Sequence, residues 1–217
     1  MKGIFYGIGI GPGDPEHITL KAVRMMKEVD VIAAPGTDVK ETLAYRIAVQ
    51  AVPEIEQKEM LPIDMPMTMD KELLLKAHKN GAETIEKVLA EGKSVGFITL
   101  GDTTVYSTFS YLEKIVKNHG FETVYISGIT SFCAAAASLG IPLTEWQEPL
   151  HVTPAVHQLD DKLALDGSYV LMKSGRQMPK VKEILKASGR KVNMVENCGL
   201  PNENKYYSVE EIPDGAG

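Results

Sequence analysis

The feature that most constrains the fold of this chain is a glycine-rich turn between an apolar strand and a helix near the N-terminus. Residues 3–10 mix β-branched and aromatic residues with glycines, which is typical of a buried strand that another group approaches closely. A Gly-Pro-Gly turn follows, and Asp14 and Pro15 stand where a helix N-cap and a first helical residue belong. The segment therefore predicts a strand, a tight turn and a helix in succession.

The same alternation continues along the chain. The other expected strands are 29–34, 58–62, 94–100, 122–127, 168–173 and 191–196. The expected helices are 14–26, 43–51, 70–91 with an interruption near Gly81, 107–117, 130–139 and 178–188. Because strands alternate with helices, we expect an α/β fold built from parallel βαβ units. Near Gly128 the sequence changes to a helix of small residues and a proline-rich loop. This change divides the chain into an N-terminal domain, 1–128, with a mainly parallel sheet, and a smaller C-terminal α/β domain, 129–217, with a mixed sheet.

Composition excludes several classes of protein. The chain has 217 residues, 44% hydrophobic and 24% charged, which is ordinary for soluble domains with a real core. Its net charge of −6 disfavours a duplex-wrapping nucleic-acid binder, because such binding rests on clustered cations. No run approaches the roughly 18 apolar residues of a membrane span. We therefore expect a cytoplasmic protein that binds neither nucleic acid nor a membrane.

Metal-site patterns are absent from the sequence. The two cysteines, Cys133 and Cys198, are too few and too far apart for a disulfide framework or a Cys-x-x-Cys site. The five histidines show no His-Glu-x-x-His pattern. We expect no metal bound by the protein itself.

The glycine-rich turn does not match a dinucleotide-binding fingerprint. In Gly-x-Gly-x-x-Gly counted from Gly7, Pro12 occupies the third glycine position, and counted from Gly9 that position is Asp14. Asp14 would also place a carboxylate at the helix N-terminus, where a phosphate would otherwise bind. A ligand at this turn is therefore expected to lack phosphate or to be cationic.

Two further loops follow predicted strands in the same way. They are LGDTTVY, residues 100–106, and SGITS, residues 127–131. The carboxyl ends of parallel strands meet at one edge of a sheet, and ligands of open α/β sheets bind there. We expect these loops and the glycine-rich turn to form one ligand site.

Together these segments resemble the tetrapyrrole methylases, a family of S-adenosylmethionine-dependent methyltransferases whose fold differs from that of the Rossmann methyltransferases. GIGIGPGDPEHITLKA, GDTTVY, SGITS and YVLMKS (169–174) stand in the family's order and spacing, over nearly the whole chain. ITLGDTTVYSTFSYL (98–112) and MPMTMD (65–70) look most like members that methylate C20 of precorrin-2 or cobalt-factor II in cobalamin biosynthesis. The resemblance implies two α/β domains, a cofactor cleft between them, and a homodimer.

The resemblance also assigns residues by position. Around S-adenosylmethionine it places Pro12, Leu100, Gly101, Asp102, Val105, Thr130, Ser131 and Met172, with Cys198 or Gly199 on the adenine side. The chain departs from many relatives at Thr103, where they have proline, and the C20 enzymes resemble it in this. Relatives also continue past a Gly-Ala-Gly like residues 215–217 into a final strand, so we expect a shortened C-terminus here.

The expected chemistry is displacement of a methyl group from a cationic sulfonium by a nucleophilic carbon. Positioning in a dry cleft does most of this work because charge is consumed in the step. The acceptor carbon must also lose a proton, and Asp14, Asp102 and Tyr106 are the candidate catalytic bases. Asp14 equally fits a helix cap or a brace of its loop.

A polycarboxylate substrate would need local cations on this acidic chain. The candidates are Arg46, Lys76, His151, Lys173, Arg176 and Lys205. Met65 and Met67 could line a flat macrocycle, because thioethers adapt to irregular surfaces. Each of these residues also fits an ordinary surface charge or loop packing.

Several alternatives stay open. The target could be another tetrapyrrole carbon, and the substrate could carry cobalt or none. Enzymes with this fold also methylate RNA or the diphthamide precursor, although the net charge and the GPGDPE turn (11–16) disfavour both. A non-catalytic S-adenosylmethionine sensor would leave the large substrate cleft without a use.

Overall fold

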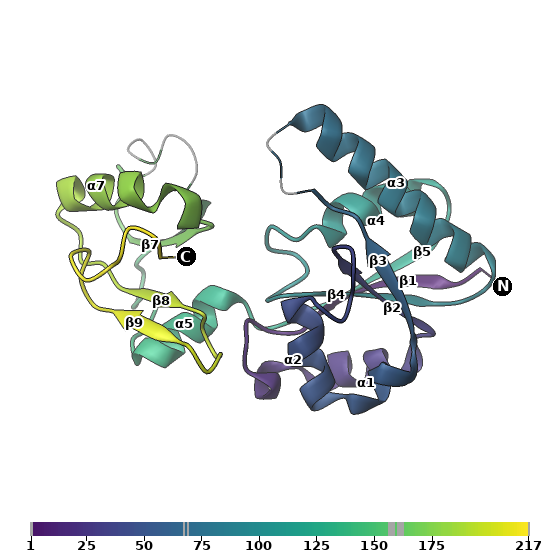
Figure 1. Ribbon diagram of the computed structural model, residues 1–217. Coiled ribbons are helices and arrows are strands. Elements are labelled where there is room, and N and C mark those ends of the chain that lie inside the picture. The colour runs from purple at the N-terminus through teal and green to yellow at the C-terminus, as the bar shows by residue number, and fades with distance from the viewer. Residues whose placement is uncertain (1, 67, 69, 156–158, 160–162, 217) are drawn as a thin grey trace. The chain divides into compact units, whose positions relative to one another are not determined.

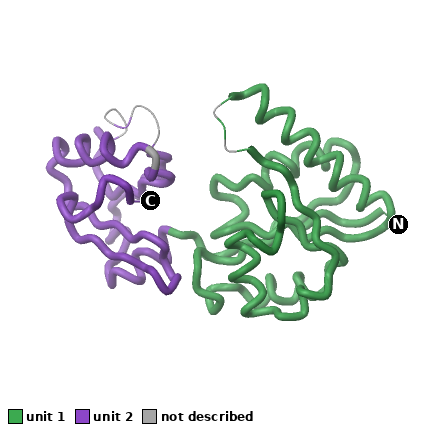
Figure 2. Tube along the Cα trace, viewed as in Figure 1, with its two compact units in different colours: residues 1–131 green, residues 132–217 purple. Residues whose placement is uncertain are grey.

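The computed structural model describes residues 2–66, 68, 70–155, 159 and 163–216. The chain divides into two compact units, residues 1–131 and 132–217 (Figure 2). The division lies three residues beyond the domain boundary expected at 128. None of the described helices has the length and apolar composition needed to cross a membrane.

A five-stranded parallel sheet forms the centre of the first unit (Figure 1). Its strands are β1 (Ile4–Gly9), β2 (Val31–Pro35), β3 (Glu59–Ile63), β4 (Val95–Thr99) and β5 (Glu122–Ile126). They lie in the order β3-β2-β4-β1-β5, and every adjacent pair is parallel. The α/β class and the parallel N-terminal sheet are therefore confirmed.

Helices cover both faces of this sheet (Figure 1). The α-helices are α1 (Leu20–Glu28), α2 (Leu43–Ala51), α3 (Lys71–Ala90) and α4 (Phe109–Asn118), and the 3-10 helices are η1 (Pro15–His17) and η2 (Pro53–Gln57). α1 and α2 lie on one face, and α3 and α4 pack together on the other. This layering buries both faces of the parallel strands, as such sheets require.

An aromatic cluster fills the core between the sheet and the α3–α4 layer. The rings of Phe5 and Phe109 are 4.9 Å apart, and Phe97 completes the cluster. Gly7 makes room for Phe109, because a Cβ at Gly7 would lie 2.4 Å from that ring. One glycine of the N-terminal strand therefore serves core packing rather than a ligand.

The expected interruption of α3 near Gly81 is wrong, because the helix continues through this residue. A Cβ at Gly81 would lie 2.8 Å from atoms of both Ile63 and Met65. The glycine lets α3 lie close to the end of β3, and this packing offsets its low helix propensity.

The single helix expected over 14–26 is also wrong, because the chain forms η1 and then α1. Ile18 and Thr19 adopt extended backbone angles between them. The hydroxyl of Thr19 accepts a hydrogen bond from the amide of Ala22 at 3.2 Å and caps α1. Threonine favours such a cap, and the helix restarts at Leu20, five residues after Pro15.

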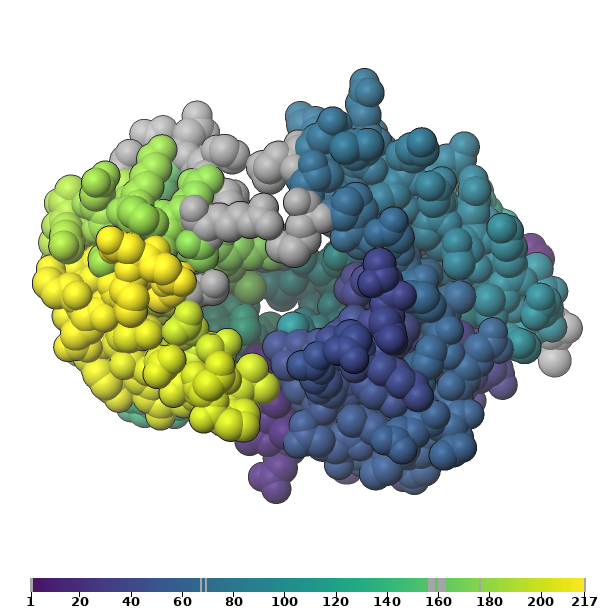
Figure 3. All heavy atoms as spheres, viewed as in Figure 1, coloured from purple at the N-terminus to yellow at the C-terminus, as the bar shows by residue number. Residues whose placement is uncertain are grey.

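The second unit is smaller and contains two separate ladders of described strands. Its elements are α5 (Ser131–Leu139), which begins at the division, β6 (Leu150–Pro154), β7 (Ser168–Met172), η3 (Gly175–Gln177), α7 (Met178–Ser188), β8 (Met194–Glu196) and β9 (Asn204–Tyr206). β6 and β7 are parallel, and β8 and β9 are antiparallel. The chain's last part, yellow in Figure 3, lies at the surface of this unit on the face shown there. The sequence did not predict β6 or β9.

Candidate cofactor-binding and active site

The loops after β1 and β4 are joined by their backbones at the carboxyl edge of the sheet. The amide of Gly11 donates to the carbonyl of Gly101 at 3.2 Å, and the amide of Gly101 donates to the carbonyl of Gly11 at 2.8 Å. The amide of Ile10 donates to the carbonyl of Thr99 at 3.1 Å. The glycine-rich turn and the LGDTTVY loop therefore form one backbone surface, as the sequence predicts.

The loop after β5 joins them through contacts that only glycine permits. A Cβ at Gly9 would lie 2.6 Å from the amide nitrogen of Gly128 and 2.8 Å from the carbonyl oxygen of Gly101. A Cβ at Gly128 would lie 2.2 Å from that same oxygen. The three loops thus meet with no side chain between them, because any Cβ would force them apart.

Asp102 links the loops of this junction by hydrogen bonds. Its side chain is only 7% exposed. One carboxylate oxygen accepts the amide of Gly128 at 2.9 Å. The other accepts the amide of Thr104 at 2.7 Å and also the Thr104 hydroxyl. A single buried carboxylate therefore links the loop after β4 to the loop after β5.

These hydrogen bonds keep Asp102 ionised. Burial by itself raises the pKa of the Asp102 carboxyl, but the hydrogen bonds from Thr104, Gly128 and Thr103 outweigh burial and leave that pKa below its ordinary value of 3.8. A carboxylate with both oxygens engaged and a lowered pKa is a poor proton acceptor. Its contacts favour the role of a brace over that of a base.

The structure places the predicted cofactor residues of the first unit on these loops. Pro12 and Val105 are half-buried, Gly101 is buried, and Leu100 is exposed. Ser131 begins α5, and its amide lies 3.8 Å from the point that a Cβ at Gly101 would occupy. The sequence prediction that these residues gather on adjoining loops agrees with this geometry, and their contact with a cofactor stays a prediction.

Thr130 carries an unsatisfied polar group at this site. Its hydroxyl oxygen is enclosed and has no hydrogen-bond partner among the described residues. Buried hydroxyls in folded proteins are nearly always hydrogen-bonded, so such an atom points to a missing partner. A ligand with polar groups, such as S-adenosylmethionine, would supply one. The residues present therefore fit the cofactor that the sequence predicts.

The remaining predicted cofactor residues belong to the second unit. Met172 is the last residue of β7 and is half-buried. Cys198 and Gly199 lie in a tight turn after β8, in which Asn197 has φ 54° and Gly199 has φ 78°. The carboxylate of Glu203 accepts the amide of Gly199 at 2.7 Å.

The other two catalytic candidates differ in their surroundings. Asp14 caps η1, since its carboxylate accepts the amide of Glu16 at 2.8 Å. Tyr106 lies on the LGDTTVY loop, is 43% exposed, and has φ 50°. A bulky residue in the left-handed region is uncommon, and such strain concentrates at functional sites. Asp14 thus has the structural role that its position predicts, and Tyr106 has an uncommon left-handed backbone within the LGDTTVY loop.

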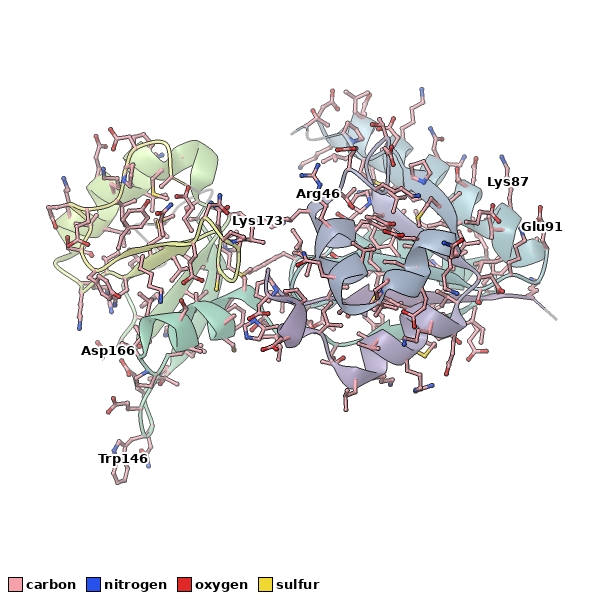
Figure 4. The ribbon with its side chains drawn as sticks, turned by 60° about the horizontal axis from the view of Figure 1, so that its bottom comes forward. Arg46, Lys87, Glu91, Trp146, Asp166 and Lys173 are labelled. Carbon is pink, nitrogen blue, oxygen red and sulfur yellow. The ribbon has the colours of Figure 1, made fainter. Side chains whose placement is uncertain are left out.

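The positions of the predicted substrate-binding residues do not by themselves indicate a substrate site. Arg46 is exposed on α2 and pairs with Glu41 at 2.8 Å (Figure 4). Met65 packs against the core beside Gly81. Met67 lies outside the described residues, and Arg176 belongs to η3. Their role in substrate binding stays a prediction.

The other candidate cations are spread over both units. Lys76 lines a pocket of about 360 Å³ beside β3 and α3. The rings of His151 and Tyr169 stack with their centroids 4.7 Å apart, so one face of the imidazole is covered by a neighbour within the second unit. Lys173 has φ 60°, and the Lys205 ammonium donates to the Ser138 carbonyl at 2.6 Å.

Sequence reasoning missed three residues that hold segments with predicted site residues: Gly9 and Gly128 in the first unit and Glu203 in the second. Gly9 and Gly128 were part of the quoted motifs, but glycines in a motif do not reveal which other backbone each one touches. Glu203 carried no signal at all, because its partner Ser138 is 65 residues away. Within the described part of the chain, no group of three or more His, Cys, Asp or Glu side chains could hold a metal ion.

Comparison with known proteins agrees with this architecture. The chain is 36% identical to the probable cobalt-precorrin-2 C(20)-methyltransferase of Methanocaldococcus jannaschii, over 91% of this chain and 84% of that protein. It is 31% identical to the precorrin-2 C(20)-methyltransferase of a Sinorhizobium species, over 99% and 91% of the two chains.

A solved structure shows the same fold. The uroporphyrin-III C-methyl transferase of Thermus thermophilus, complexed with S-adenosyl homocysteine, superposes with a TM-score of 0.70 at 21% identity, covering 99% of this chain and 95% of that one. The family model for tetrapyrrole (corrin/porphyrin) methylases matches residues 5–213. With its fold, its three joined glycine loops and this match, the chain belongs to the tetrapyrrole methylases.

Proposed function

We propose that the protein transfers a methyl group from S-adenosylmethionine to C20 of precorrin-2 or cobalt-factor II in cobalamin biosynthesis. The observation that carries this proposal is the 36% identity, over 91% of the chain, to a probable cobalt-precorrin-2 C(20)-methyltransferase. The relative named for metal-free precorrin-2 is 31% identical over 99% of the chain. One relative is named for a substrate that contains cobalt and the other for the metal-free precorrin-2, so the test includes both kinds of substrate.

The chain's own groups suit the binding of this cofactor. S-adenosylmethionine supplies an activated methyl on a cationic sulfonium. The Thr130 hydroxyl offers an unused hydrogen-bonding group, and it lies on the loop that the close glycine contacts join to the other two. Met172, Cys198 and Gly199 of the second unit complete the proposed set. A cationic ligand without phosphate also agrees with the carboxylate of Asp14 at the turn.

We assign positioning, rather than one strong base, as the main contribution of the protein. One oxygen of the Asp14 carboxylate accepts the amide of Glu16 at the start of η1, and both oxygens of Asp102 accept hydrogen bonds at the loop junction. Tyr106 remains the candidate whose side chain is substantially exposed on the loop. Transfer is then expected to survive removal of the Asp14 carboxylate, because holding the donor and the carbon in line supplies most of the acceleration.

The proposal includes a homodimer in the cytoplasm. Trp146 stands at the tip of a projecting loop and is fully exposed (Figure 4). A tryptophan is rarely left wholly in water, and aromatic residues are enriched in interfaces. This exposure supports a second copy as the group that covers the loop. The two free cysteines suit a reducing compartment.

The test uses methyl-labelled S-adenosylmethionine with precorrin-2 in one reaction and cobalt-factor II in another. We expect one labelled methyl at C20, located by mass and magnetic resonance, and the faster reaction identifies the natural substrate. A labelled methyl at another carbon would move the assignment to a different step of the pathway. No transfer to either substrate, with cofactor binding intact, would refute the proposed activity.

A further inference from the structure

We propose that Glu203 is a positioning residue for the cofactor, because its carboxylate fixes the turn formed by residues 197–200. The inference rests on the proposed function, in which Cys198 and Gly199 of this turn bound the adenine side of S-adenosylmethionine. All the contacts that carry it lie within the second unit.

One carboxylate ties three segments of the second unit together. One oxygen of Glu203 accepts the amide of Gly199 at 2.7 Å. The other accepts the hydroxyl of Ser138, in the last turn of α5, at 2.6 Å and lies 3.4 Å from the ammonium of Lys205 on β9. Lys205 in turn donates to the carbonyl of Ser138 at 2.6 Å. The turn is therefore held against a helix and a strand at the same time.

The turn contains two residues with a left-handed backbone. Asn197 and Gly199 both have positive φ, 54° and 78°. The local hydrogen bonds are few: the amide of Leu200 donates to the carbonyl of Asn197 at 2.9 Å, and that of Glu203 to the carbonyl of Leu200 at 3.0 Å. Asparagine and glycine adopt this conformation readily, so contacts rather than strain decide how firmly the turn is held. Glu203 supplies the contact from outside the turn.

The charge of Glu203 also acts on the neighbouring thiol. Hydrogen bonds from Ser138 and Gly199 lower the pKa of the Glu203 carboxyl, so it stays ionised. Burial, and then the negative charge and hydrogen bonding of Glu203, raise the pKa of the Cys198 thiol. Because the thiolate is the reactive form, Cys198 is expected to react slowly while Glu203 is in place. Thiol reactivity therefore reports on this contact without any substrate.

The first measurement is the affinity for S-adenosylhomocysteine by titration calorimetry. We compare the wild type with Glu203→Ala and Glu203→Gln. We expect Glu203→Ala to bind about tenfold more weakly, which corresponds to the loss of a charge-assisted hydrogen bond. Glu203→Gln should lie in between, because an amide can accept from Gly199 while donating to Ser138. In turnover assays the KM for S-adenosylmethionine should rise with kcat nearly unchanged.

Glu211→Ala is the matched control. Its carboxylate also accepts one backbone amide of the second unit, that of Tyr207 at 2.8 Å, but it is exposed and does not touch the 197–200 turn. Its affinity for S-adenosylhomocysteine should equal that of the wild type.

The second measurement is the alkylation rate of Cys198 by iodoacetamide. Cys133 is exposed, so Cys133→Ser is used as the background and leaves Cys198 as the single thiol of the chain. Glu203→Ala should speed alkylation several-fold, and S-adenosylhomocysteine should slow it in the wild-type turn. An unchanged rate in Glu203→Ala would show that the carboxylate does not control this turn and would overturn the proposal.

The outcomes separate this inference from the proposed function. If the wild type binds no S-adenosylhomocysteine, the proposed function fails and the positioning role fails with it. If the wild type binds and a folded Glu203→Ala, checked by thermal unfolding, binds equally well, only the role of Glu203 is overturned. If Glu203→Ala does not fold, the affinity for S-adenosylhomocysteine is compared in Glu203→Gln and Ser138→Ala instead. Wild-type affinity in both variants would overturn the positioning role of Glu203.

Discussion

Replacing Asp102 with asparagine should weaken the loop junction in a pH-dependent way. The carboxylate accepts from the amide of Gly128 through one oxygen and from Thr104 through the other. An asparagine has one oxygen and one NH2 group, so one of these amides would face another donor instead of an acceptor. The substitution keeps the size of the side chain and removes one acceptor and the charge.

The expected loss of stability at neutral pH is about 2–3 kcal/mol. Hydrogen bonds to charged groups contribute roughly 1.5–3 kcal/mol each, and a buried donor without a partner adds its own desolvation penalty. Asp102 is only 7% exposed, so solvent cannot take over the lost contact. With a urea dependence of about 2 kcal/mol per molar, the unfolding midpoint should fall by about 1 M.

The sign of the pH dependence follows from the lowered pKa of Asp102. A group whose pKa is lower in the folded state stabilises that state fully above its unfolded pKa. This contribution is lost as the pH falls below the ordinary value of 3.8 and through the folded pKa. The difference in stability between the wild type and Asp102→Asn should therefore be constant near neutral pH and should narrow below about pH 4.

The assay is urea unfolding followed by circular dichroism at pH 7 and at steps down to pH 3. Asp38→Asn is the control, because Asp38 accepts the amide of Lys40 at 2.9 Å in a similar turn but is exposed. It should change stability by less than about 0.5 kcal/mol. Equal stability of wild type and Asp102→Asn at pH 7, or a difference that persists undiminished in acid, would refute the reasoning.

Three further predictions test other parts of the site. Gly128→Ala should cost about 3 kcal/mol in urea unfolding and abolish cofactor binding, since its Cβ would lie 2.2 Å from the Gly101 carbonyl oxygen, whereas Gly215→Ala, with nothing within 4 Å, should be neutral. Asp14→Asn keeps an acceptor for the Glu16 amide, so stability and methyl transfer should both be retained; loss of transfer with intact cofactor binding would make Asp14 the base. The single tryptophan, Trp146, should shift its fluorescence to shorter wavelength as the homodimer forms, and a concentration-independent spectrum together with a monomeric mass in light scattering would contradict the dimer.

Local pattern was sufficient for the order and type of most elements. Short apolar runs, most of them rich in β-branched residues, predicted all five strands of the parallel sheet, because each strand's signal lies within its own few residues. The glycine-rich turn and the LGDTTVY and SGITS loops could be assigned to one edge for a related reason: parallel strands bring their carboxyl ends together whatever their order. Two strands of the second unit were missed. β9 is three residues long and carries little pattern, and β6 lies in a segment whose prolines, Pro149 and Pro154, favour a loop.

What the sequence determined by itself was the α/β class, the parallel sheet and the loops that carry the site. The tertiary structure alone decided which groups meet there. Gly128 lies 26 residues from the carboxylate of Asp102, and Ser138 lies 65 residues from Glu203. Such pairs leave no trace in local periodicity, because the hydrogen bond depends on how two loops are brought together by the packing of the sheet and its helices. The sequence determines which chemical groups each residue offers, and the fold determines which hydrogen-bond partner each group contacts.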